Sequence, residues 1–156
     1  MAYPFGFTYV SGPCFIRGLN VASAATFAAF QPLRLNAASD VAESLVTQNQ
    51  ILGFSLARAI DSLPAGKVNV LVPSDRAIFA SLTTAAASEV SSGVTGGMIK
   101  SGNSWYFHPS GISNIFVVVP REDGSTLDST DSSVWVQVNG AALRPFNFSG
   151  VNTIIL

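Results

Sequence analysis

Residues 68–82 read VNVLVPSDRAIFASL, and the pattern of this stretch changes at its centre. Before Pro73, three valines occupy alternate positions, which predicts a short strand with one apolar face. Pro73 ends that strand, and Ser74 can cap a helix because its side chain can accept a hydrogen bond from a free amide of the first turn. The sequence therefore predicts a strand followed by a helix that carries Ala77, Ile78, Phe79 and Leu82.

A longer helix is predicted upstream, beginning at Asp40. Glu43 follows three residues later, as in a capping box, and Pro64 and Gly66 would end the helix. Apolar residues follow at helical spacing and are expected to face the core: Val41, Leu45, Leu52, Leu56, Ala59, Ile60 and Leu63.

The second half of the chain is dominated by predicted strands. Residues 81–104 are rich in Ser, Thr, Ala and Gly and predict short helical turns and a mobile loop. Strands are expected at 105–107, 115–119 and 134–138, the last with Val134, Val136 and Val138 on one face.

Asn139-Gly140 is a signal for a two-residue hairpin turn, because this pair tolerates the positive φ angles of a type I′ turn. A returning strand is expected at 141–146 and a last apolar strand at 151–156. The expected fold class is α+β, with amino-terminal helices packed on a β-sheet formed mainly by the second half.

Residues 1–36 form an apolar, aromatic-rich region that predicts an extended strand near its start and a short helix at 21–30. This region could cover the core of its own chain, or it could be an arm that lies on another subunit, where rings supply large contact area. The candidate interface residues of the arm are Tyr3, Phe5, Phe7, Tyr9 and Phe15.

The chain has 156 residues, enough for one domain or one domain with an arm. Charged residues make up 11%, less than half of the roughly 25% usual for soluble domains. A surface with so little charge is expected to be hidden against neighbouring subunits. The formal charge of −1 and scattered basic residues argue against a nucleic-acid partner, and no stretch is long and apolar enough for a membrane helix.

Catalytic and metal-binding patterns find no support in the sequence, so no enzyme activity and no cofactor is expected. His108 is the only histidine, and a packed or capping role is favoured over catalysis. Cys14 is the only cysteine and is expected to be a buried thiol. Four acids could bind calcium, but their spacing favours a solvated turn between strands: Glu122, Asp123, Asp128 and Asp131.

The order of these segments resembles fasciclin (FAS1) domains over roughly residues 52–156. The segment 68–82, with Pro73, Ser74, Asp75 and Ala77, resembles the first motif of that family, and LARAIDSLPAG at 56–66 is similar to the preceding helix. The remaining motif residues match a Tyr-His pair loosely and the Asn-Gly of the closing strands: Tyr106, His108, Asn139 and Gly140. The resemblance implies a FAS1-like domain at 37–156 that binds partners through surface patches and has no catalytic residues.

We therefore expect a non-enzymatic structural protein that packs with other protein subunits into a homo-oligomer or a capsid-like shell. The low charge, the aromatic arm and the lack of a recognisable export signal suit a virion component such as a capsid cement or decoration protein. The alternative is a secreted adhesion or matrix-binding module of the FAS1 type, located outside the cell.

Overall fold

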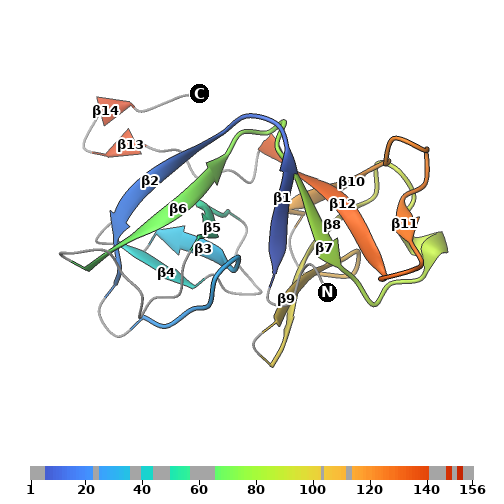
Figure 1. The fold of residues 1–156 in the computed structure, drawn as a ribbon, viewed down its shortest axis with the longest axis horizontal. Coiled ribbons are helices and arrows are strands. Elements are labelled where there is room, and N and C mark those ends of the chain that lie inside the picture. Colours follow the sequence, from blue (N-terminus) through green and yellow to red (C-terminus); the bar gives the residue numbers. More distant parts are fainter. Residues whose placement is uncertain are drawn as a thin grey trace.

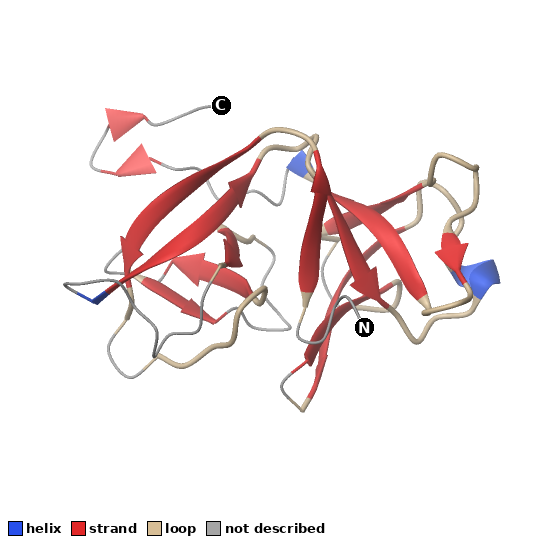
Figure 2. Cartoon of the chain, in the orientation of Figure 1, coloured by secondary structure: helices blue, strands red, loops and turns tan. Residues whose placement is uncertain are grey.

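The chain folds as an all-β protein in the computed structural model (Figure 2). The structure describes residues 6–22, 25–35, 40–43, 50–56, 66–102, 104–111, 114–140, 147–148 and 151–152. Within these ranges the helical residues form short 3₁₀ turns, such as Ala87–Glu89, and no α-helix is present.

Two antiparallel sheets make up the fold (Figure 1). The first sheet has the strand order β1 (Phe7–Ser11), β7 (Ile78–Leu82), β12 (Ser133–Val138), β10 (Phe116–Val119), β8 (Thr95–Ser101) and β9 (Ser104–His108), with β11 (Leu127–Asp128) also paired to β12. The second has the order β2 (Cys14–Asn20), β6 (Lys67–Pro73), β5 (Gly53–Ser55), β3 (Pro32–Leu35) and β4 (Val41–Glu43). A separate pair joins β13 (Asn147–Phe148) to β14 (Val151–Asn152).

A ribbon of two bent segments connects the sheets. The chain passes from β1 into β2, and it returns from β6 into β7, so that β1 pairs with β7 and β2 with β6. At the bend, Ser11 is paired with Ile78 and Cys14 with Pro73, and the Ser74 N–H donates to the Pro13 carbonyl oxygen at 3.0 Å. Strands that bend in this way are a known means of turning a corner between two sheets.

The bend depends on a glycine. Gly12 has a φ of +98°, and a Cβ at this position would lie 2.4 Å from the Arg76 carbonyl oxygen and 2.7 Å from the Ala77 Cα. Both the backbone conformation and the close approach of the second segment therefore require a residue without a side chain.

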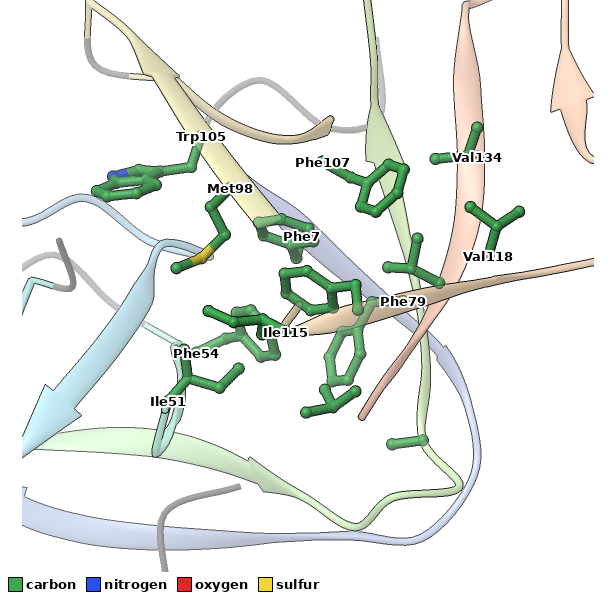
Figure 3. Packing of buried hydrophobic residues seen from close by; sticks show 14 of the residues in the cluster. Phe7, Ile51, Phe54, Phe79, Met98, Trp105, Phe107, Ile115, Val118 and Val134 are labelled. Carbon is green, nitrogen blue, oxygen red and sulfur yellow. The ribbon is translucent and has the colours of Figure 1, made fainter. Parts of the chain in front are cut away.

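Two hydrophobic clusters fill the molecule, one associated with each sheet. The larger cluster contains Phe7, Phe54, Phe79 and Phe107 (Figure 3), together with Phe116 and other buried residues. The smaller one lies in the second sheet around Leu33, Val41, Leu52, Val68, Val70 and Val72. Strand β5 and the residues just before it serve both clusters, because Ile51 and Phe54 belong to the larger and Leu52 to the smaller.

The expected α+β fold is wrong. Where a helix was expected after Pro73, the chain makes one turn, and then residues 78–82 form β7, which lies between β1 and β12 in the first sheet. The Ser74 hydroxyl does accept the Arg76 N–H at 3.1 Å, and the Ser74 carbonyl accepts the Ala77 N–H at 3.2 Å. These bonds are those of a single turn, and a serine that can cap a helix can equally close such a turn.

The predicted helix from Asp40 is also wrong wherever the structure describes it. Residues 41–43 form β4 and residues 53–55 form β5, whereas 44–49 and 57–65 lie outside the described residues. Residues 51–55 are buried without a break, because β5 lies between the two clusters. A strand that is buried on both faces does not alternate between apolar and polar residues. The apolar residues of this stretch therefore also fit the spacing of a helix, which led to the wrong prediction.

The short helix expected at 21–30 is wrong in its described part as well. Val21 forms an isolated bridge with Val41, residues 25–28 are irregular, and a turn follows at 29–30. Phe27 from this segment is buried in the smaller cluster. The segment therefore lies on the second sheet as a connection between β2 and β3.

The strand predictions based on strict alternation are confirmed. Residues 67–73 form β6, with Val68, Val70 and Val72 buried, and residues 133–138 form β12, with its valines buried and Trp135 and Gln137 half-buried. Residues 104–108 form β9, and β10 begins one residue later than expected. The Ser- and Gly-rich residues 81–104 contain the expected short turn, but they also contribute β8, which the sequence did not indicate.

The hairpin turn expected at Asn139-Gly140 is not of type I′. Neither residue is among the described residues with positive φ, which that turn requires at both positions. The Asn139 N–H donates instead to the Ile115 carbonyl oxygen at 2.7 Å, beyond the last pair between β10 and β12. The returning strand expected at 141–146 lies outside the described residues, and of 151–156 the structure describes β14 alone.

Candidate functional site

The aromatic side chains of the amino-terminal region have different environments. Tyr3 and Phe5 lie outside the described residues. Phe7 is 1% exposed in the larger cluster, and its ring stacks on that of Phe116 with centroids 4.7 Å apart. Phe15, on β2, is half-buried and packs on the smaller cluster. At Phe7 and Phe15 this region therefore covers the core of its own chain.

Tyr9 differs from Phe7 although both lie on the same side of β1. Its side chain is 46% exposed, its ring meets the Phe79 ring edge-on with centroids 6.0 Å apart, and its hydroxyl donates to the Gly12 carbonyl oxygen at 2.7 Å. These contacts hold the ring in place while one part of it faces solvent. A ring that is already ordered loses little further conformational entropy when a partner covers it.

Two more large apolar side chains are exposed, and neither is one of the interface residues expected from the sequence. Ile16 of β2 is 57% exposed, and Phe30 in the turn before β3 is 37% exposed. Ile16 follows Phe15 on the opposite face of the strand, so alternation was a signal that could have found it. We call Tyr9, Ile16 and Phe30 the amino-terminal surface residues. Among the described residues they are the large hydrophobic side chains that are exposed.

The backbone of Phe30 is strained and held from both sides. Its φ is +67°, a conformation that is an outlier for a bulky residue. The Phe30 N–H donates to the Ser55 carbonyl oxygen at 2.8 Å, and its carbonyl oxygen accepts the Phe7 N–H at 3.0 Å. Phe30 thus links β5 of the second sheet to β1 of the first. Glycine would adopt this φ at lower cost, so the backbone conformation does not account for the phenyl ring.

The motif residues that carried the resemblance to FAS1 domains lie at the end of β6, in β9 and in the turns of the fold. Pro73 is buried at the end of β6, and Ser74 closes the turn that follows it. Asp75 is exposed, and a Cβ placed on Gly140 would lie 3.4 Å from its carboxylate. The structure therefore brings Asp75 close to Gly140, although they are far apart in the sequence.

Tyr106 and His108 point to the same side of β9, away from the core side occupied by Trp105 and Phe107. The His108 Nδ1 lies 3.1 Å from the backbone nitrogen of Ser110 and 2.7 Å from its hydroxyl oxygen, so it accepts the N–H and caps the turn after β9. The imidazole ring of His108 therefore makes its hydrogen bonds within this turn.

The four acids that follow Pro120 do not converge. Asp123 accepts hydrogen bonds from the N–H and hydroxyl of Ser125, and these bonds lower the pKa of its carboxyl group. Asp128 accepts the Thr130 N–H at 2.9 Å, and Asp131 accepts the Ser133 hydroxyl at 2.5 Å. Glu122 is exposed. Within the described ranges no group of three or more acidic, His or Cys side chains could hold a metal ion.

Arg121 organises this acidic loop. Its Nη2 donates to the carbonyl oxygen of Ser133 at 3.1 Å and to the hydroxyl of the same residue at 2.8 Å. Its Cζ lies 5.1 Å from the centroid of the Trp135 ring, and its Nη1 is 4.0 Å from Asp128. Arg121 therefore joins this loop to β12, in addition to the backbone pairing of β11 with β12.

Cys14 lies at the first position of β2, half-buried against the larger cluster. Burial raises the pKa of its thiol from 9.0 to about 11. The thiol is therefore protonated and weakly nucleophilic near neutral pH.

Comparison with known proteins identifies no relative: no family model matches the chain, and neither a curated protein nor a solved structure matches it. In the part of the chain that the structure describes, no helix has the length and apolar character needed to cross a membrane.

Proposed function

We propose that this chain is a non-enzymatic structural protein that packs with other protein subunits into a larger assembly, as a cement or decoration protein of a virion shell. The supporting observation is the position in the sequence of the exposed apolar side chains. Tyr9, Ile16 and Phe30, the large hydrophobic residues exposed within the described ranges, all come from the first 30 residues of the chain.

The low charge of the chain adds to this argument. With 11% charged residues, the surface has little of the electrostatic repulsion that keeps copies of a soluble protein apart. Burying apolar area is worth about 25 cal/mol per Å², and aromatic rings carry large areas, so covering Tyr9 and Phe30 favours association. Many identical contacts in a shell would multiply this contribution through avidity.

The strained backbone of Phe30 allows a clean experiment. Replacing Phe30 with Gly removes the ring and relieves the positive φ, while Tyr9→Thr and Ile16→Thr retain residues that favour strands. We expect the triple variant to give an unchanged circular-dichroism spectrum and to lose its association. Val117→Thr is the matched control, because this half-buried valine lies on β10, away from the amino-terminal surface residues.

The measurement is light scattering after size exclusion on untagged protein from its natural source. The proposal expects the wild-type chain and the Val117→Thr control in a many-copy particle, and the triple variant as a folded monomer. If the wild-type chain is a monomer at every concentration, or if the triple variant assembles normally, the proposal fails. A wild-type monomer whose gene encodes a secretion leader would favour the extracellular adhesion module instead.

A further inference from the structure

An open pocket of about 410 Å³ lies beside the end of β7. Its walls come from three parts of the chain: the residues at and after the end of β7, the middle of β9, and the turn before β12. The polar side chains that line it are Thr83, Thr84, Tyr106, Asp131 and Ser132. None of the residues that line the pocket is one of the amino-terminal surface residues.

The pocket is fixed by the fold. Trp105 and Phe107 are buried, so Tyr106 between them lies on the outer side of β9 and faces the end of β7. The Thr83 N–H donates to the Ser132 carbonyl oxygen at 2.8 Å, which joins two of the walls. The Thr83 hydroxyl oxygen also accepts the Ala85 N–H at 3.1 Å, which fixes that side chain. A ligand would therefore meet walls that are already ordered.

The pocket offers hydroxyl groups, one carboxylate and one aromatic ring. Asp131 uses its Oδ1 to accept the Ser133 hydroxyl, and within the described ranges its Oδ2 has no hydrogen-bond donor. The Tyr106 hydroxyl likewise makes no hydrogen bond to a described residue. The lining contains no cationic side chain, so a phosphate or another anion would be repelled by Asp131.

From this combination we propose that the pocket binds a neutral saccharide. Sugar hydroxyls can donate to the free oxygen of Asp131 and exchange hydrogen bonds with Thr84 and Ser132. The C–H face of a pyranose ring can lie against the Tyr106 ring, whose face carries partial negative charge. The volume falls within the 300–1,000 Å³ range of ligand pockets and suits one or two sugar rings.

A cationic ligand is disfavoured by the exposure of the carboxylate. Asp131 is exposed, and an ion pair with an exposed carboxylate is worth only about 0–1 kcal/mol. A sugar gains from several neutral hydrogen bonds and from the aromatic face together. The two kinds of ligand also differ in salt dependence, because salt screens the ion pair and leaves the sugar contacts nearly unchanged.

The test is an NMR titration of the full chain with methyl glycosides of glucose, galactose and N-acetylglucosamine. We expect at least one glycoside to shift the amide signals of Thr83, Thr84, Tyr106 and Ser132, with a Kd of about 1–10 mM that does not change when about 0.5 M salt is added. The absence of shifts for all three glycosides up to about 50 mM would overturn the proposal. Salt-sensitive shifts with methylammonium alone would overturn it as well, in favour of a cation.

Variants then assign the binding to the pocket. Asp131→Asn keeps an oxygen that can accept the Ser133 hydroxyl but removes the charge, and Tyr106→Ala removes the ring; each is expected to weaken binding about 10-fold or more. Asp123→Asn is the matched control, because this carboxylate lies in the turn before β11, is bonded to Ser125 and does not line the pocket. Equal binding by all three variants would show that the sugar binds elsewhere and would overturn the proposal.

Discussion

The Ser81 hydroxyl joins β7 to β9, because its oxygen accepts the backbone N–H of Phe107 at 2.9 Å. The same hydroxyl donates to the Leu82 carbonyl oxygen at 2.8 Å, and Ser81 is fully buried. Strand β9 is the last strand in the hydrogen-bonded order of the first sheet, whereas β7 lies near the opposite edge. A side chain therefore links two strands that have no backbone ladder between them.

Replacing Ser81 with Ala should leave the Phe107 N–H buried without a partner. The expected loss of unfolding free energy is about 1–3 kcal/mol, measured by urea denaturation. Ser101→Ala, at the exposed end of β8, is the control and should change stability by less than about 0.5 kcal/mol. Equal stability of the two variants would mean that the Ser81 bond contributes nothing to the fold.

Two glycines on the same ribbon should respond differently to alanine. Gly12→Ala places a Cβ against the Arg76 carbonyl oxygen at positive φ, and we expect a loss of about 3 kcal/mol or more, or failure to fold. Gly18→Ala in β2 meets its nearest neighbour, the Asn69 side chain, at an ordinary 3.7 Å. This second variant should be neutral or slightly stabilising, because alanine lowers the entropy of the unfolded chain. Thermal unfolding of both proteins distinguishes a bend-specific effect from a general cost of alanine.

Reactivity of Cys14 should follow its raised pKa. Near pH 8, alkylation by iodoacetamide should be on the order of 100-fold slower than in the urea-unfolded chain, because the thiolate fraction falls as the pKa rises. The rate should climb about 10-fold per pH unit towards a plateau near the folded pKa of about 11. A plateau near pH 9 would show that the thiol is not shielded.

The same pKa sets the sign of a stability effect. The folded chain holds the Cys14 proton more tightly than the unfolded chain, since its pKa is raised. This contribution to stability is fully present below the unfolded pKa near 9 and is lost as the pH rises towards 11. Cys14→Ser should therefore make unfolding less sensitive to pH across this window, as urea titrations at a series of pH values would show.

The sequence predicted strands well where one face alone is buried. In β6 and β12, valines on the core side alternate with more exposed residues, and period-two alternation is a direct signal of that geometry. The signal failed at residues 51–55, which are buried on both sides by the two clusters. It also failed after Ser74, because the local hydrogen bonds of one turn are common to helix starts and to turns between strands.

The candidate surface was predictable only in part. The composition marked residues 1–36 as rich in aromatic rings. Phe7 and Tyr9 share a face of β1, however, and the side chain of Phe7 is 1% exposed whereas that of Tyr9 is 46% exposed. That difference depends on which long-range neighbours cover each ring, and a local pattern does not contain it. Phe30 could not be foreseen in its left-handed conformation, since bulky residues rarely adopt positive φ. The pocket at Tyr106 combines three segments that only the fold brings together.

Arg121 provides the last test, because its contacts differ in expected strength. The bonds from its Nη2 to Ser133 are partly buried and come from a charged donor, and the guanidinium also lies over the Trp135 ring. Hydrogen bonds of this kind contribute about 1.5–3 kcal/mol, whereas an ion pair with the partly exposed Asp128 contributes about 0–1 kcal/mol. Lysine carries the charge but lacks the planar fork.

Arg121→Lys should therefore lower the unfolding free energy by about 1–3 kcal/mol. Asp128→Asn should cost less than about 1 kcal/mol, since the amide oxygen can still accept the Thr130 N–H. Urea denaturation of both variants ranks the two effects. If Asp128→Asn were the more damaging change, the loop would be held mainly by charge, and its stability would then fall steeply with added salt.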